Sequence, residues 1–253
     1  MTPIWNGGKI SSMFAYEGSK YNDNLQFSSN EAKEAFYDGK WYLKVDGSCC
    51  AIDTISGIAY QRVNLPNKDI PKMNIKMENG SQPNRIVKDN KETHNYYWQP
   101  FDKPNENQKS KQRKLLEEIY KVTSRYCNEY KNNNSEGNLI LVEFCGQKFQ
   151  KTPNIKEDIV IVEHLKQEFN TILSDGTNIR EPELVKKYLS EHAIEGFICS
   201  HPVTNTRYKI RSNMFFDKKS CLYEQLHQYW MKFKSIDKFS NFLDERDYPL
   251  IYN

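Results

Sequence analysis

A lysine, an acid and a glycine follow an apolar run near residue 44, in the order Lys44, Asp46 and Gly47. The preceding Trp41-Tyr42-Leu43 is apolar and aromatic, so Lys44 is expected at the end of a strand beside buried neighbours. Such surroundings favour the neutral, nucleophilic form of an amine. The glycine permits a sharp turn and close approach of a ligand to the backbone. The spacing therefore predicts a lysine that attacks a bound substrate.

Three further charged residues lie inside or at the ends of apolar segments. Arg62 ends the next expected strand, Glu143 lies within the apolar run 139–144, and Glu195 opens the run Gly196-Phe197-Ile198. A charge in such a place costs free energy unless a partner compensates it. We therefore expect these residues to contact a ligand or one another.

Two cations close this ordered series, Lys209 and Arg211, on either side of Ile210. Alternate residues of a strand point to the same face, so both cations are expected on one side of a sheet. Together they would hold phosphates and stabilise the charge of a leaving pyrophosphate. By like-charge repulsion they would also favour the neutral form of Lys44.

The two glutamates and one apolar residue complete a site for a nucleoside triphosphate. Glu143 and Glu195 are expected to accept hydrogen bonds from ribose hydroxyls or to hold a divalent metal, and the sequence leaves the division of these roles open. Ile198 is expected to lie against a flat base. His164 and the basic segment Lys109 to Lys131 are interpreted as structural and as a solvated helix face, respectively.

In this order, the segments resemble the covalent nucleotidyltransferase superfamily of DNA ligases, RNA ligases and mRNA capping enzymes. Lys44-Val45-Asp46-Gly47 is similar to its nucleophile motif, Glu143 with Gly146 to its ribose-side motif, Glu195-Gly196-Phe197-Ile198 to its Glu-Gly-aliphatic motif, and Lys209 with Arg211 to its final basic motif. The resemblance implies that Lys44 carries a nucleoside monophosphate. It implies catalytic roles for Lys44, Asp46, Glu195 and Lys209, and nucleotide binding by Lys44, Arg62, Lys68, Glu143, Ile198, Lys209 and Arg211.

Within that superfamily, three segments resemble the ATP-dependent 5′–3′ RNA ligases of the vertebrate RNA ligase 1 type. They are 44–50, with the distinctive adjacent Cys49 and Cys50, then 62–68, and then 194–201. This resemblance implies ATP as AMP donor, Mg²⁺ or Mn²⁺, and RNA with 5′-phosphate and 3′-hydroxyl ends as partner. Leu43 stands where the family often has glutamate, and Arg211 where lysine or histidine is commoner.

Three alternatives stay open. An mRNA guanylyltransferase uses the same lysine chemistry with GTP, and a minimal DNA ligase acts on DNA ends. The segment after Arg211 has a helical pattern and not the strand pattern of a five-stranded OB-fold, which disfavours capping enzymes and larger DNA ligases. An inactive RNA-binding module on the same scaffold is disfavoured because Lys44, Glu143, Glu195 and Lys209 are all present.

The expected strands and helices are interspersed without strict alternation, which predicts an α+β fold of antiparallel sheets flanked by helices. Strands are expected over 41–62 with a glycine turn, and at 139–144, 158–163, 195–200 and 207–210; helices at 31–36, 109–131, 183–189 and 222–233; loops over 64–95. The resemblance implies one nucleotidyltransferase domain, an ATP-grasp-like ligase adenylation domain, over 1–253. Residues 1–40 would be an N-terminal extension and 217–253 a helical tail, without a C-terminal OB-fold.

Composition bounds the class of protein. The chain has 253 residues and a formal net charge of +3, which does not by itself indicate nucleic-acid binding. No apolar run reaches the roughly 18 residues of a membrane-spanning helix, and residues 1–10 lack the apolar core of a secretory signal. The six cysteines show no zinc-site spacing. These features predict an intracellular, cytoplasmic protein with reduced thiols.

Overall fold

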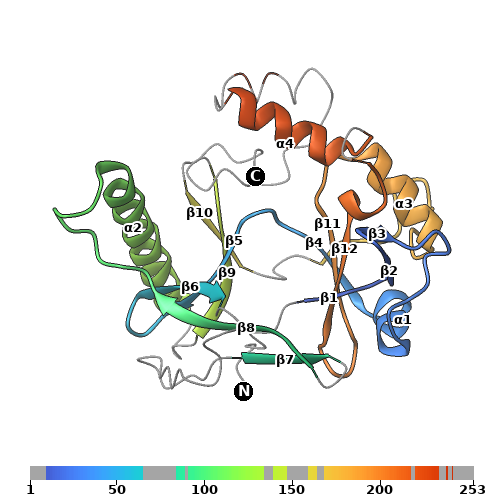
Figure 1. Ribbon diagram of the computed structural model, residues 1–253, viewed down its shortest axis with the longest axis horizontal. Helices are drawn as coiled ribbons and strands as arrows, with labels where there is room; N and C mark the ends of the chain where they lie inside the picture. Colours follow the sequence, from blue (N-terminus) through green and yellow to red (C-terminus); the bar gives the residue numbers. More distant parts are fainter. Residues whose placement is uncertain are drawn as a thin grey trace. The chain divides into compact units, whose positions relative to one another are not determined.

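The chain divides into two compact units (Figure 1). The computed structural model describes residues 10–64, 84–88, 91–133, 139–146, 159–163, 168–217, 220–233, 238 and 241. Among these, residues 47–146 and 159–163 belong to unit 1. Residues 10–46 and those from 168 onward belong to unit 2. Both units are therefore assembled from segments that are distant in sequence.

Unit 1 is an antiparallel sheet with one long helix. Its strand order is β10-β9-β5-β6-β8-β7. The bounds are β5 Ser48–Asp53, β6 Ile58–Asn64, β7 Asn84–Lys88, β8 Lys91–Pro100, β9 Leu139–Cys145 and β10 Val160–Glu163, with helix α2 at Ser110–Asn133. The prediction of loops over 64–95 is wrong in part, because β7 and the first half of β8 lie in this range. Tyr96-Tyr97-Trp98 lies within β8.

The core of unit 1 forms where α2 packs on the sheet. The buried stripe of the helix, Leu116, Ile119 and Val122, recurs at helical spacing. It packs with Cys50 and Val142, which come from β5 and β9. Burial raises the pKa of the Cys50 thiol, which stays protonated. The expected amphipathic helix at 109–131 is confirmed, and Cys50 packs as a small core residue.

Unit 2 is built on a four-stranded sheet in the order β1-β12-β11-β4. Its strands are antiparallel, except that β1 runs parallel to β12. A short hairpin, β2-β3, and several helices complete the unit. The bounds are β1 Ser11–Ser12, β2 Tyr16–Glu17, β3 Lys20–Tyr21, α1 Asn30–Tyr37, β4 Lys40–Leu43, α3 Pro182–Glu191, β11 Gly196–Ser200, β12 Arg207–Arg211, the 3₁₀ helix η1 Ser212–Met214 and α4 Leu222–Phe233.

One face of the unit 2 sheet is the core of that unit. Trp41, Phe197 and Ile210 alternate inward from β4, β11 and β12, and none of them is exposed. They belong to one apolar cluster with residues of α1 and α3, among them Phe36 and Leu189. Because side chains alternate along a strand, the residues between these core positions occupy the opposite face. That opposite face carries the charged residues described below.

The coarse architecture agrees with the sequence: antiparallel sheets and helices form an α+β chain. The finer assignment to a single nucleotidyltransferase domain stays a prediction. Residues 10–40, expected as an extension, contribute β1 and α1 to the sheet and core of unit 2. After Arg211, the described residues form η1 and α4. No helix in the described part of the chain is long and apolar enough to cross a membrane.

Candidate functional site

Lys44 and Glu195 are brought together by the pairing of β4 with β11. Phe197 lies opposite Leu43, so the next register position places Lys44 opposite Gly196. The Lys44 backbone N–H donates to the Gly196 carbonyl at 2.9 Å. The side chains form an ion pair, with 2.6 Å between Lys44 Nζ and Glu195 Oε1. Two residues that are distant in sequence thus meet at the ends of adjacent strands.

The glutamate of this pair is buried. Its side chain is only 10% exposed, against 21% for Lys44. Oε1 faces the lysine, whereas Oε2 is buried without a hydrogen-bond partner among the described residues. A buried carboxylate oxygen that lacks a donor is destabilising. This oxygen is therefore a candidate contact for a bound ligand or cation.

Gly196, which follows the glutamate, brings β11 close to β12. Its φ is +146°, in the region that favours glycine, and a Cβ atom there would lie 1.9 Å from the Ile210 carbonyl oxygen. Any other residue would push the two strands apart. Glycine at position 196 is thus a steric requirement, because it lets β12, which carries the cations, approach β11.

Arg211 and Lys209 lie on β12 at the registers of Gly196 and Ile198. Directly paired residues of an antiparallel ladder project to the same face, so both cations share the face of Lys44. Arg211 Nε lies 3.9 Å from Glu195 Oε1 and has no hydrogen-bond partner among the described residues. One carboxylate is therefore flanked by two cations, and the net charge of this cluster is positive.

Ile198 occupies the middle of this face. It lies opposite Tyr42 on one side and Lys209 on the other, and it is 4% exposed. The expectation that Ile198 contacts a base stays a prediction. The register places Ile198 on the same sheet face as Lys209, and little of its surface is exposed.

Asp46 is held by α4, an interaction that the sequence did not predict. The Tyr223 hydroxyl donates to Asp46 Oδ2, and His227 Nδ1 lies 3.8 Å from the same oxygen. Burial and the nearby charge of Asp46 raise the pKa of Tyr223 far above its usual value, so Tyr223 remains a phenol that donates. The amphipathic pattern of 222–233 predicted a helix with an apolar stripe, but no role for its polar residues. The available signal was the spacing of Tyr223 and His227, one helical turn apart.

Glu143 and Arg62 belong to unit 1, whereas the residues above belong to unit 2. Glu143 lies in β9 opposite Cys49 and is 8% exposed. A Cβ atom on Gly47 would lie 2.9 Å from the Phe144 carbonyl oxygen and 2.9 Å from Glu143 Oε2, so the close approach to the β9 backbone favours glycine at this position. Arg62 lies in β6 and is exposed. Lys68 and His164 lie outside the described residues.

The metal assignment to Glu143 and Glu195 also stays a prediction. Within the described ranges, no group of three or more His, Cys, Asp or Glu side chains is arranged to hold a metal ion. Mg²⁺ commonly uses only one or two protein carboxylates together with substrate phosphates and water. The donor chemistry of Glu195, with one buried oxygen left without a hydrogen bond, fits such a cation.

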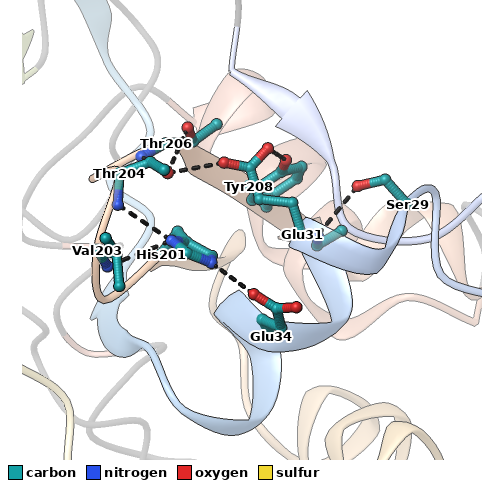
Figure 2. A network of polar contacts seen from close by, with 9 residues as sticks. Ser29, Glu31, Glu34, His201, Val203, Thr204, Thr206 and Tyr208 are labelled. Atoms are coloured by element: carbon teal, nitrogen blue, oxygen red, sulfur yellow. Dashed lines mark hydrogen bonds and ion pairs between the residues drawn. The ribbon is translucent and has the colours of Figure 1, made fainter.

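A second polar network lies at the opposite end of the β11–β12 hairpin (Figure 2). His201 Nδ1 accepts the backbone N–H groups of Val203 and Thr204, and Nε2 lies 2.9 Å from Glu34 Oε2. Because Nδ1 is an acceptor, the hydrogen resides on Nε2. Thr204 also donates to Glu31 in α1. This network ties the hairpin turn to α1.

Glu31 is the other anchor of this second network. Thr204 Oγ1 and the Tyr208 hydroxyl donate to its two carboxylate oxygens, each at 2.7 Å. These hydrogen bonds lower the pKa of Glu31, with that from Thr204 the largest cause. Both carboxylate oxygens thus have donors within the protein, as expected for a structural role.

Comparison with models of known protein families and with curated proteins found no match for this chain.

Proposed function

We propose that this protein is an ATP-dependent RNA ligase that forms a covalent lysyl-AMP on Lys44 and joins 5′-phosphate to 3′-hydroxyl RNA ends. One observation carries the proposal: Lys44 Nζ lies 2.6 Å from the buried Glu195, which Arg211 also approaches. A lysine that pairs with a buried carboxylate in this way would serve proton transfer and nucleophilic attack. The resemblance of the ordered motifs supplies the choice of ATP and RNA.

In the first step, the Lys44 amine attacks the α-phosphate of ATP. A P–N bond forms, and the bond to pyrophosphate breaks. The attack requires the amine lone pair, and Glu195 Oε1 lies within hydrogen-bond reach to receive the proton. Lys209 and Arg211, which share the face of Lys44, would stabilise the charge on the departing pyrophosphate.

The remaining residues would bind and orient the nucleotide. Glu143, Arg62 and Lys68 are proposed to contact the ribose and phosphates, and Ile198 the base. Glu143 and Glu195 would hold Mg²⁺ or Mn²⁺. Such an ion, when bound, would neutralise phosphate charge.

Two further steps follow from the resemblance. AMP passes from Lys44 to the 5′-phosphate of an RNA end, which creates an activated phosphoanhydride. The 3′-hydroxyl of a second end then attacks this phosphate, a phosphodiester bond forms, and AMP leaves.

The decisive experiment measures covalent labelling. The protein is incubated with Mg²⁺ and α-³²P-labelled ATP or GTP, and retained label is counted after a denaturing gel. We expect label from ATP on the wild type and on Lys40→Ala, a control four residues earlier whose side chain is 67% exposed. Lys44→Ala should give none. Labelling by GTP alone would indicate a guanylyltransferase, and no label from either nucleotide would contradict an enzymatic function.

A second assay identifies the substrate ends. Nicked or single-stranded RNA with a 5′-phosphate and 3′-hydroxyl is compared with DNA of the same sequence. We expect joining of RNA ends. Joining of DNA alone would replace the proposal with a minimal DNA ligase.

A further inference from the structure

The contact between α4 and Asp46 lies two residues from the proposed nucleophile. The Tyr223 hydroxyl and His227 Nδ1 both approach Asp46 Oδ2. Tyr223 is 8% exposed, and its ring stacks on that of His227 with 6.4 Å between centroids. Tyr223 thus hydrogen-bonds this carboxylate oxygen, and His227, from the same helix, lies close to it.

The same helix is tied to Glu195 through η1. Asn213 Nδ2 donates to Glu224 Oε1 at 2.8 Å. Cys221 Sγ lies 3.6 Å from Ser212 Oγ. The Ser212 backbone N–H in turn donates to the Glu195 carbonyl at 2.9 Å. The start of α4 is therefore linked both to the acid and to the segment that carries the amine.

Apolar packing alone does not account for these polar contacts. Leu226 and Trp230 bury α4 without needing a carboxylate. Tyr223 instead donates to a charged acceptor, which forms a stronger hydrogen bond than a neutral one. His227 Nδ1 is buried without a hydrogen-bond partner among the described residues, and it lies 3.8 Å from Asp46. The polar side of α4 is thus directed at the motif that follows Lys44.

We propose that Tyr223 and His227 are positioning residues for Lys44, which act by holding the Asp46 carboxylate. Lys44 directly follows β4, and its backbone N–H still donates to the Gly196 carbonyl, whereas Asp46 lies two residues further along the chain, beyond this pairing. Contacts that hold the Asp46 carboxylate restrict the backbone dihedral angles between Lys44 and Asp46. They thereby fix the direction of the Lys44 amine toward Glu195. The inference rests on the proposed function, because its readout is formation of lysyl-AMP.

The test is the single-turnover rate of lysyl-AMP formation over a range of ATP concentrations. Tyr223→Phe and His227→Gln should each lower the maximal rate, Tyr223→Phe by about tenfold, since small misplacement of a reacting group has large effects on rate. The ATP concentration for half-maximal rate should change less than about twofold, as expected when alignment and not ground-state binding is lost. Tyr16→Phe removes a hydroxyl from an exposed tyrosine of the same unit and should have no effect.

A double-mutant cycle separates positioning from general damage. In an Asp46→Ala background, Tyr223→Phe should lose most of its effect on the maximal rate, because the two residues act through one contact. Thermal unfolding of each variant verifies that it is folded at the assay temperature. Unchanged maximal rates, a change confined to half-saturating ATP, or independent effects in the cycle would overturn the inference while wild-type labelling upholds the proposed function. A wild type that takes no label would overturn both.

Discussion

The two ends of the β11–β12 hairpin carry polar networks of opposite character. At the turn end, His201 and Glu31 have hydrogen-bond partners from the turn and from α1 (Figure 2). At the other end, Glu195 Oε2 and Arg211 Nε are buried without hydrogen-bond partners among the described residues. We call the turn end saturated, because these polar groups have hydrogen-bond partners. We call the other end unsaturated, because it holds buried polar groups that lack such partners among the described residues.

This difference separates structure from proposed function. Buried polar groups in folded proteins are nearly always hydrogen-bonded, because an unmade bond is destabilising. A network that meets this rule requires no ligand to satisfy its polar groups. The turn network meets it and holds α1 against the hairpin. A cluster that breaks the rule keeps donors and acceptors available to a ligand, which is typical of functional sites.

Substitution of Lys44, at the unsaturated end of the hairpin, should have a larger effect on activity than any other change. Lys44→Arg keeps the positive charge, but a guanidinium does not lose its proton in proteins, so it cannot attack. Lysyl-AMP formation should fall more than about 10⁴-fold, the scale seen when a nucleophile is removed. Quenched-flow labelling with α-³²P-ATP measures the rate. Glu34→Gln, in the turn network, should keep the wild-type rate, and an active Lys44→Arg variant would refute the assignment of the nucleophile.

Two arginines of β12 test whether position along the strand matters for activity. Arg211 lies at the unsaturated end of β12 and Arg207 at the turn end. Arg211→Ala should lower the rate of lysyl-AMP formation about 10²-fold, since one preorganised donor to a developing negative charge is worth that much. Arg207→Ala should change it less than about twofold. Equal losses in the two variants would mean that charge on the whole strand, and not position, matters.

The turn network should respond in stability and not in activity. His201→Ala removes the acceptor of two backbone N–H groups and should lower the free energy of unfolding by about 1–3 kcal/mol. His201→Asn offers an oxygen close to the position of Nδ1 and should recover part of this loss. Urea unfolding measures both variants. Labelling rates at a temperature where all are folded should match the wild type, and a selective loss of labelling would place His201 in the site.

The smallest effect is a pH dependence at Glu31. Its pKa is lowered in the folded protein, so its contribution to stability is present above the unfolded value of about 4.3 and is lost as the pH falls through the folded value. Glu31→Gln should therefore be less stable than the wild type at pH 7, by up to about 1 kcal/mol after solvent screening. Urea unfolding should show this gap closing below about pH 4.

Thr204→Val provides the matched variant, because it removes the main cause of the lowered pKa of Glu31. It should reduce the same pH dependence and leave the contribution of Tyr208. A gap between Glu31→Gln and the wild type that is constant from pH 7 to pH 3.5 would show that the Glu31 charge contributes no stability.

The elements with strong periodicity were predictable. Lys209, Ile210 and Arg211 alternate between a polar and a buried face as their spacing indicated, and α2 has its expected apolar stripe. The strands β7 and β8 were missed because their segment is rich in Asn and Lys and lacks a continuous apolar run. Backbone pairing with β6 places β8 in the sheet, and such pairing leaves little trace in local composition.

The order of the chemical groups could be recognised from the residues alone: the amine of Lys44, the carboxylates of Asp46 and Glu195, and the cations of β12. The contacts of Lys44 with Glu195 and of α4 with Asp46 became visible only in the folded chain. Local residue patterns encode which face of an element is apolar. Strand register and helix docking depend on contacts between residues far apart in the chain, and these contacts exist only after the chain has folded.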